Sequence, residues 1–257
     1  MISTGTAPGN RGDVLILHGL GDHIDRFRWA IQLLDSAGYR VVGIDWPGCG
    51  KSPGVRGDLP TMEEAGPLVE KVLNSLSCSP IGVLAHSTGA FYLARFLADG
   101  LPFTQNLKWV WFSSPLIAPA HGQPPFKIAI AKLLSRLLPK MTLSTGVNPS
   151  DCHDAEEESG FPEGVHNRIS LRFGAELMAA DEKVDSIASR IPADLELLFT
   201  QGSSDSVCPP KFAVQFFNAL KTPLKTMILV SGGRHEPFQD RDSARFTNAL
   251  RSWLRLR

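Results

Sequence analysis

The stretch Ile81-Gly82-Val83-Leu84-Ala85-His86-Ser87-Thr88-Gly89, followed by a helix-like run over residues 90–98, decides the fold that this sequence predicts. An apolar run enters a turn at Ser87, and the helical run leaves it. A sharp strand–turn–helix with serine at its apex holds the hydroxyl clear of the sheet, as in a nucleophile elbow. The bend is crowded, so the positions two before and two after the serine carry almost no side chain, and Ala85 and Gly89 meet that demand.

A second match to the same five-residue pattern, Gly50-Lys51-Ser52-Pro53-Gly54, lacks the structural context. Pro53 and the glycine-containing residues 54–58 exclude a following helix. Residues 48–52 also resemble the end of a phosphate-binding loop, but that motif needs a helix where Pro53 stands. The sequence therefore predicts Ser87, and not Ser52, as a nucleophile.

The bulk composition is that of a soluble globular protein. The 257 residues are 43% hydrophobic and 20% charged, with zero formal net charge, so nothing indicates a nucleic-acid partner. Cys49, Cys78, Cys152 and Cys208 show no metal-binding or redox spacing, and we expect free thiols and no metal or cofactor. Residues 1–12 contain no apolar signal-peptide core, and no window approaches the ~18–20 apolar residues of a membrane span. We expect a cytoplasmic protein.

Strand and helix patterns alternate along most of the chain, which favours an α/β fold with a mostly parallel sheet covered on both faces. The expected sheet has about six strands. The expected strands are residues 13–17, 39–44, 81–85, 108–112, 195–199 and 225–230. The expected helices are residues 26–37, a helix capped by Thr61 and Glu64, residues 90–98, residues 210–220, and a closing helix with Phe246, Leu250, Trp253 and Leu254 on one face.

The alternation breaks over residues 116–190, where the sequence predicts helices and loops but no strand. We interpret this segment as a helical lid inserted into a core domain of residues 1–115 and 191–257. Its strongest feature is the apolar run 126–138, which ends at Pro139. Periodicity does not decide whether this run lines a tunnel for an apolar substrate or forms the lid's own core. A transient contact of the lid with a membrane surface and the oligomeric state are left open.

A serine hydroxyl needs a neighbouring base, and seven histidines are available. His235 follows the last predicted strand, where loops of a parallel sheet gather over the site. His86, adjacent in the turn, is expected to point elsewhere. Asp205 occupies the matching loop after the preceding strand, and the order Ser87, Asp205, His235 is that of the α/β-hydrolase triad.

The predicted oxyanion donors are backbone N–H groups, which need to face the developing charge in advance. Thr88 follows the nucleophile at a helix N-terminus. The string His18-Gly19-Leu20-Gly21 ends the first predicted strand, and Leu20 N–H, flanked by glycines, is the expected second donor. His235-Glu236 begins like a zinc-protease helix, but Gln239 stands where the second ligand would be.

In combination these motifs resemble the monoacylglycerol lipase and lysophospholipase branch of the α/β-hydrolases over nearly the whole chain. The resemblance is carried by residues 18–23, 45–52, Arg56-Gly57, His86-Ser87-Thr88-Gly89, Ser113-Ser114-Pro115-Leu116, Gly202-Ser203-Ser204-Asp205 and His235-Glu236. It implies an ester hydrolase that acts through an acyl-enzyme, with a mobile helical lid over an acyl pocket. It also implies that Asp22 and Arg26, which match polar positions near the family's glycerol pocket, contact a substrate head group.

Three features depart from the family pattern. Ala85 replaces the first glycine of the elbow, at little steric cost. Cys49 stands where the family usually has histidine. The residues before the first predicted strand leave no room for the antiparallel hairpin that usually opens the sheet, which is why six strands are expected instead of eight.

The sequence therefore predicts a serine carboxylic-ester hydrolase for monoacylglycerols or similar lipid esters. A thioesterase or a peptidase remains an alternative because the triad chemistry is shared. A ligand-binding receptor or scaffold with little turnover is the alternative from another class. Acyl-chain length and head group are not determined by the sequence.

Overall fold

The computed structural model describes residues 2–3, 11–76, 81–121, 124–154, 160–180, 182–240 and 243–255. The predicted six parallel strands are confirmed. They are β2 (Asp13–Leu17), β3 (Arg40–Ile44), β4 (Ile81–His86), β5 (Leu107–Ser113), β8 (Glu196–Gly202) and β9 (Lys225–Val230). A two-residue strand, β1 (Ile2–Ser3), adds to β3 in antiparallel orientation, and the strand order is β1-β3-β2-β4-β5-β8-β9. One short antiparallel strand thus stands where the sequence predicted no room for a hairpin.

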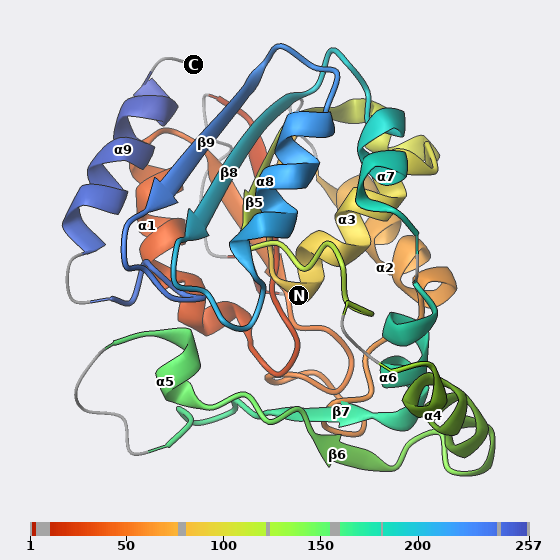
Figure 1. Cartoon of the computed structure of the whole chain (residues 1–257). Helices are drawn as coiled ribbons and strands as arrows, with labels where there is room; N and C mark the ends of the chain where they lie inside the picture. The colour runs from red at the N-terminus through yellow and green to blue at the C-terminus, as the bar shows by residue number, and fades with distance from the viewer. Residues whose placement is uncertain are drawn as a thin grey trace.

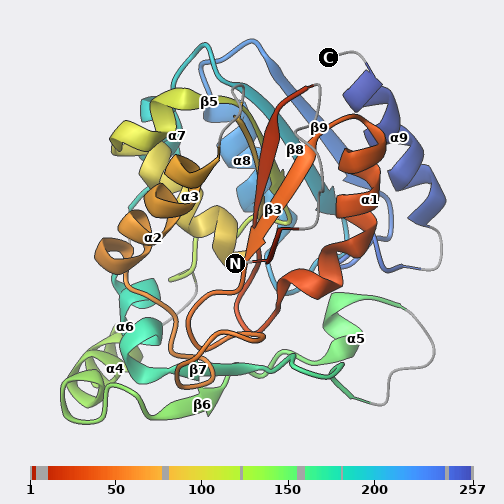
Figure 2. The same ribbon diagram turned by 180° about the vertical axis from the view of Figure 1, so that it is seen from behind.

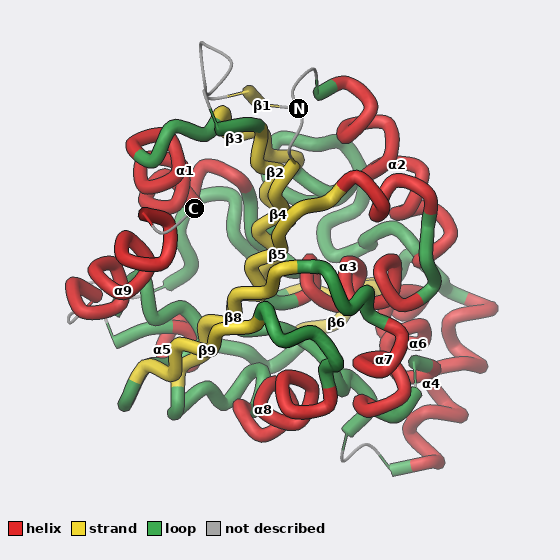
Figure 3. The backbone as a smooth tube through the Cα atoms, turned by 90° about the horizontal axis from the view of Figure 1, so that it is seen from above, coloured by secondary structure: helices red, strands yellow, loops and turns green. Residues whose placement is uncertain are grey.

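Helices cover both faces of this sheet, and Figure 3 shows it edge-on between them. One face packs against α1 (Arg28–Ser36), which continues a 3₁₀ turn (Ile24–Phe27), and α9 (Ser243–Arg255). The other face packs against α2 (Met62–Ser75), α3 (Thr88–Ala98), α7 (Val184–Arg190) and α8 (Pro210–Ala219). A 3₁₀ turn (Pro102–Asn106) leads into β5. Every residue of β2 and β4 is buried, as expected for strands covered on both sides.

The predicted capping box and the amphipathic closing helix are both present. Glu64 N donates to Thr61 Oγ1 at 3.3 Å, and Thr61 N donates to the Glu64 carboxylate at 2.8 Å, so α2 begins after Thr61. In α9, Phe246, Leu250, Trp253 and Leu254 are buried against the sheet. These local patterns are strong enough in sequence to set the elements without tertiary information.

The segment between β5 and α7, which we call the cap, lies at the carboxyl ends of the strands, at the bottom of Figures 1 and 2. It contains α4 (Pro125–Leu137), α5 (Pro149–Cys152) and α6 (Leu171–Ala179), whereas α7 packs beside α3 and α8 on a face of the main sheet. It also contains β6 (Thr142–Ser144) and β7 (Arg168–Ser170), which form a two-stranded antiparallel sheet. The prediction of no strand in this segment was wrong, because three-residue strands are too short to show a periodic pattern.

Helix α4 matches the apolar run 126–138, but the apolar side chains on its outer face take neither predicted role. Phe126, Ile130, Leu133 and Leu137 are 62%, 51%, 58% and 69% exposed, so they are not the core of the cap. None of the α4 side chains that the structure describes lines the pocket discussed below. The helix packs against α6 and leaves a strip of apolar side chains in solvent. None of the helices in the described part of the chain is long and apolar enough to cross a membrane.

Candidate active site

Ser87 lies at the sharp turn between β4 and α3 in a strained backbone conformation. Its φ of 51° and ψ of −114° fall in a region that residues with a side chain seldom adopt. The end of β5 holds this conformation in place, because Ser87 N donates to Ser113 O at 3.0 Å and Leu116 N donates to Ser87 O at 3.2 Å. The turn therefore depends on tertiary contacts as well as on its own sequence.

Two glycines allow the backbone to pack closely around the nucleophile. A Cβ atom at Gly89 would lie 2.2 Å from Leu17 O, so α3 would have to move away from β2. A Cβ atom at Gly19 would lie 3.0 Å from Ser87 Cβ. The small residues that the sequence places beside Ser87 are thus required by contacts with the neighbouring strand and its loop.

Asp205 and His235 meet in the loops that follow β8 and β9. His235 Nδ1 donates to Asp205 Oδ2 at 2.8 Å. The carboxylate is buried and also accepts from Val207 N at 2.9 Å, Cys208 N at 2.8 Å and Gln201 Nε2 at 2.8 Å. Four donors around one carboxylate keep it in a single orientation. That orientation leaves His235 Nε2 available to take a proton.

The environment of His235 raises its pKa above the ordinary 6.5. Burial alone lowers this pKa, but the charge of Asp205 and its hydrogen bond more than offset burial. The imidazolium that forms during proton transfer is therefore stabilised. The histidine is neutral, and able to act as a base, only at pH values above this raised pKa.

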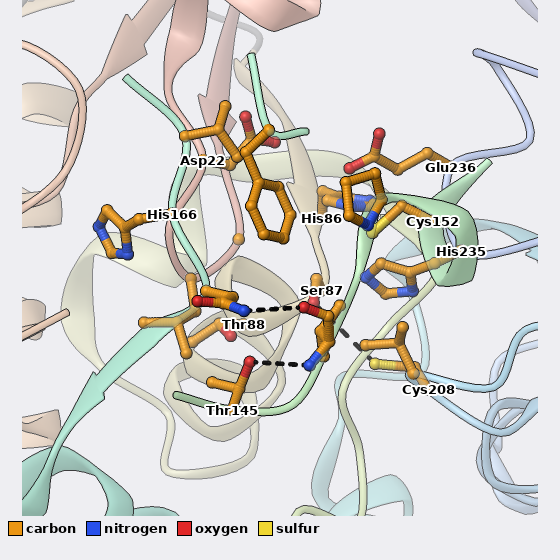
Figure 4. Close-up of a pocket in the computed structure, with 18 of the residues that line it drawn as sticks. Asp22, His86, Ser87, Thr88, Thr145, Cys152, His166, Cys208, His235 and Glu236 are labelled. Atoms are coloured by element: carbon orange, nitrogen blue, oxygen red, sulfur yellow. Dashed lines mark hydrogen bonds between the residues drawn. The ribbon is translucent and has the colours of Figure 1, made fainter. Parts of the chain in front are cut away.

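Ser87 and His235 line the same pocket, whose volume is about 200 Å³. Figure 4 shows Ser87, His235 and Cys208 together on one side of it and His166 on the other. Within the described residues, Ser87 Oγ has a hydrogen-bond contact with Cys208 Sγ at 4.0 Å and none with His235. Catalytic hydrogen bonds of this kind commonly tighten only when substrate is bound.

The two residues predicted to supply the oxyanion donors, Leu20 and Thr88, both line this pocket. The buried His18 orients the first of them. Its Nε2 accepts from Trp46 N at 3.1 Å, so its Nδ1–H donates to Gly19 O at 2.7 Å. The Gly19 carbonyl and the Leu20 N–H belong to one planar peptide and point in opposite directions. Holding the carbonyl on the His18 side therefore turns the Leu20 N–H away from His18.

The polar wall of the pocket is a buried ionic cluster of Asp22, Arg26 and Glu236. Arg26 donates to both Glu236 oxygens, at 3.1 and 2.6 Å, and to Asp22 Oδ1 at 3.2 Å. Burial alone lowers the pKa of Arg26, but the two carboxylates more than offset this effect and raise it. The structure thus brings together Asp22 and Arg26, the two residues that the family resemblance implied as head-group contacts. It also places Glu236 beside them.

The rest of the pocket is mainly apolar and is built largely by the cap. Val147, Phe161, Val165, Ile169 and Leu177 come from the cap, and Leu116 and Val207 come from loops at the ends of β5 and β8. The pocket therefore combines one ionic cluster with a larger, mainly apolar lining beside Ser87. This arrangement suits a molecule with a short polar head and a hydrocarbon tail.

A family model described as serine aminopeptidase, S33, matches residues 8–242. The chain belongs to this α/β-hydrolase family. The crystal structure of a monoacylglycerol lipase from Paleococcus ferrophilus superimposes with a TM-score of 0.82 at 32% sequence identity, covering 96% of this chain and 95% of that one. The hydrolase therefore lies in the monoacylglycerol lipase-like branch, and the resemblance stated from its motifs is confirmed.

Curated relatives of the hydrolase are more distant in sequence. The monoacylglycerol lipase of Mycolicibacterium smegmatis is 24% identical over 258 residues, covering 95% of this chain and 88% of that protein. An uncharacterised abhydrolase domain-containing protein of Dictyostelium discoideum is 25% identical over 256 residues. That match covers 95% of this chain but only 26% of the Dictyostelium protein.

Three site residues of the hydrolase were not predicted in the positions that they occupy. Gln201 lies near the end of β8 and holds Asp205. Its place two residues past the predicted strand was the one sequence feature that pointed to this role. His86 was expected to point elsewhere, but its ring lies 4.9 Å from that of His235 and lines the pocket. Burial lowers the pKa of His86 well below the ordinary value, with His235 adding to the shift, so it stays neutral. Cys208 contacts the nucleophile and carried no recognisable signal in sequence.

The free cysteines of the hydrolase are protonated thiols. Burial raises the pKa of Cys49 and Cys152 to about 12 and that of Cys208 well above its ordinary value. Cys49, Cys152 and Cys208 form no disulfide, whereas Cys78 lies outside the described residues. A protonated thiol is a poor nucleophile, so Ser87 has no sulfur competitor in the pocket.

Proposed function

We propose that this chain is a serine carboxylic-ester hydrolase that cleaves monoacylglycerols or similar monoacyl lipid esters through an acyl-enzyme. The observation that carries the proposal is that His235, hydrogen-bonded to Asp205, lines one pocket with the strained Ser87. An ionic cluster in an otherwise mainly apolar pocket supports a substrate that is amphipathic. Membership of the monoacylglycerol lipase-like branch agrees with this chemistry.

In the proposed mechanism, Ser87 Oγ attacks the ester carbonyl as His235 Nε2 takes its proton. The N–H groups of Leu20 and Thr88 stabilise the negative charge on the tetrahedral oxygen, and Asp205 stabilises the imidazolium. His235 then returns the proton to the departing alcohol, which leaves the acyl group on Ser87. A water molecule, deprotonated by His235, releases the fatty acid and restores the hydroxyl of Ser87.

The charge of the ionic cluster favours a neutral head group over an anionic one. With Asp22 and Glu236 ionised and Arg26 cationic, the cluster carries −1 + 1 − 1 = −1. A phosphate would be repelled by this balance, whereas glycerol hydroxyls can donate to Asp22 and accept from neighbouring N–H groups. We therefore propose a monoacylglycerol in preference to a lysophospholipid.

The same negative balance makes an amine the second candidate head group. The family description names an aminopeptidase, and a substrate ammonium would be attracted to Asp22 or Glu236. Both carboxylates, however, are already bound to Arg26 within the protein, which weakens their hold on a second cation. Aminoacyl anilides therefore belong in the substrate panel beside the esters.

We also propose that α4 rests on a lipid surface while substrate is taken up. Its exposed apolar strip of Phe126, Ile130, Leu133 and Leu137 is accompanied by the exposed basic residues Lys132, Arg136 and Lys140. Residues 101–150 contain no Asp or Glu. An apolar strip flanked only by positive charge fits the interface of an anionic membrane.

The proposal is tested first by labelling with a fluorophosphonate probe. The wild type should be labelled and Ser87→Ala should not, while Ser52→Ala, which alters the second match to the elbow pattern, should be labelled normally. An ester panel of increasing acyl length should then show highest kcat/KM on monoacylglycerols, with thioesters and aminoacyl anilides slower.

The outcomes of this experiment separate the alternatives. Loss of labelling in Ser52→Ala with retention in Ser87→Ala would overturn the choice of nucleophile. Labelling of the wild type without turnover of any ester, thioester or anilide would overturn the enzymatic proposal in favour of a binding protein. Fast anilide hydrolysis with slow ester hydrolysis would replace the lipase proposal with a peptidase.

A further inference from the structure

A second cavity lies beside the catalytic pocket and is not used in the mechanism above. It has a volume of about 280 Å³ and lies between the chain that follows β5, residues 115–121, and the start of α8, residues 206–212. Three residues, Leu116, Val207 and Cys208, line both this cavity and the catalytic pocket. The two spaces are therefore separated by a partition that is one side chain thick.

Cys208 is the part of this partition whose side chain contacts the reacting atom. Its Sγ lies 4.0 Å from Ser87 Oγ, and the residue is 3% exposed. The backbone on both sides of the thiol is held, since Cys208 N donates to Asp205 Oδ1 at 2.8 Å and Cys208 O accepts from Gln201 Nε2 at 3.3 Å. Because these bonds belong to the network around Asp205, the thiol has little freedom to move aside for a substrate.

The position of the thiol corresponds to one particular atom of an acyl-enzyme. When an acyl group is attached to Ser87 Oγ, the carbon next to its carbonyl is two bonds from that oxygen. A sulfur 4.0 Å from Oγ is already at van der Waals distance from groups bonded to Ser87. A substituent on this carbon that points toward Cys208 would therefore meet the sulfur.

The second cavity could accommodate such a substituent. Most of its lining residues are apolar, including Ile117, Ala118 and Phe212, although polar atoms, among them those of the exposed His121 and Ser206, share its surface about equally with apolar ones. An apolar cavity of about 150 Å³ holds a benzene ring, so a space of about 280 Å³ is sufficient for a phenyl group. What prevents its use is the partition, and not a lack of room.

We propose that Cys208 is a specificity-determining residue that restricts the enzyme to acyl groups without a substituent next to the carbonyl. The inference rests on the proposed ester hydrolysis and extends it to the acyl side of the substrate. Removing the thiol would join the two cavities beside Ser87. The enlarged site would take branched or aryl-substituted acyl groups, with the substituent in the second cavity.

The test compares kcat/KM for two p-nitrophenyl esters, butanoate and 2-phenylbutanoate, which differ only in the phenyl substituent. Cys208→Ala should raise the ratio of 2-phenylbutanoate to butanoate at least about 10-fold, the discrimination typical of a small steric change in an apolar pocket. Cys152→Ala is the matched control, because Cys152 lines only the catalytic pocket. Its ratio should stay close to that of the wild type.

A second substitution locates the added space. Ala118 lines only the second cavity, so Ala118→Phe should fill it from the far side. The double variant Cys208→Ala with Ala118→Phe should therefore return the ratio to the wild-type value. A gain that persists in the double variant, or equal gains in Cys208→Ala and Cys152→Ala, would overturn the role of the partition.

The proposed function and this inference fail in distinguishable ways. If the wild type hydrolyses butanoate but the ratio does not change in Cys208→Ala, the partition does not limit the acyl group and only this inference is lost. If a folded wild type hydrolyses neither ester and reacts with no fluorophosphonate, the proposed function is lost, and the inference that rests on it is lost as well.

Discussion

Helices α3 and α4 are similar in sequence and opposite in environment. Both are short, both carry a run of large apolar side chains, and both were predicted as helices from that run. Every residue of α3 is buried beneath the cap and against the sheet. In α4, by contrast, the apolar positions Phe126, Ile130, Leu133 and Leu137 are more than half exposed.

The difference shows what an apolar helical pattern does and does not determine. The pattern predicts a helix in both cases, but the partner of the apolar face comes from the rest of the fold. Helix α3 follows the elbow directly, so its position over the sheet is dictated by β4. Helix α4 lies in a segment that contains no strand of the main sheet. Among the helices and strands of the described chain, its main packing partner is α6. Its outer face is available to a lipid surface.

The largest expected effect is on the catalytic rate, at the buried carboxylate of Asp205, which holds His235. Asp205→Asn should lower kcat by about 10³- to 10⁴-fold, because His235 loses its orientation and the stabilisation of its imidazolium. Activity requires neutral His235, so wild-type kcat/KM should fall as the pH drops through a pKa above 6.5. The variant lacks the charge that raises this pKa, and its acid limb should therefore move to lower pH. A pH–rate profile measures both effects.

The control for this variant is Asp194→Asn, which changes an exposed carboxylate at the opposite end of β8. Its kcat and its acid limb should match those of the wild type. Equal losses in the two variants, or an acid limb in Asp205→Asn that stays in place, would contradict the assignment of Asp205.

The comparison between the two helices is tested directly by one substitution in each. Leu93→Ala, in the buried α3, should lower the free energy of unfolding by about 2–5 kcal/mol because it leaves a cavity. Leu133→Ala, in α4, removes the same atoms from a side chain that is 58% exposed. It should change the free energy of unfolding by less than about 0.5 kcal/mol. Urea unfolding of both variants gives the two values. Similar losses would mean that α4 is packed far more closely than the structure shows.

The next effect concerns the part of the cap that is firmly attached to the core. Buried Asp58 accepts from Ser170 Oγ at 2.7 Å and from Arg172 Nε at 3.2 Å. Asp58→Asn should destabilise the protein by about 1–3 kcal/mol, since these donors lose a charged acceptor. Glu64→Gln is the control, because this second carboxylate bound to Arg172 is 54% exposed and its ion pair contributes only about 0–1 kcal/mol. Thermal unfolding that ranks the two variants in the reverse order would refute the role of Asp58.

The smallest effect is expected at the exposed strip of α4. The double variant Leu133→Asp with Leu137→Asp should reduce turnover of monoacylglycerol in anionic vesicles about 5- to 10-fold, because the partial burial of two apolar side chains in lipid is lost. Hydrolysis of a water-soluble short-chain ester should be unchanged. Leu224→Asp, which changes a half-exposed leucine at the other end of the sheet, serves as the control and should affect neither reaction. A parallel loss on the soluble ester would show that α4 acts on the site and not on the lipid surface.

The sequence by itself determined the six parallel strands, the elbow at Ser87 and the loops that carry Asp205 and His235. It could do so because these features are local: apolar runs, capping residues and glycines beside a turn are visible within short windows. Parallel strands then bring their carboxyl ends to one edge, so residues in successive loops meet there. The expected positions of Leu20 and Thr88 on the pocket wall follow from the same rule.

Only the tertiary structure decided the contacts between residues that no local pattern connects. Glu236 binds Arg26 from 210 positions away, Gln201 holds Asp205 from inside a strand, and Cys208 closes the space beside Ser87. The short strands β6 and β7 and the exposed face of α4 belong to the same class. Their formation depends on which surfaces the completed sheet and cap present to one another, and hydrophobic burial is not directional enough to specify those partners from the sequence alone.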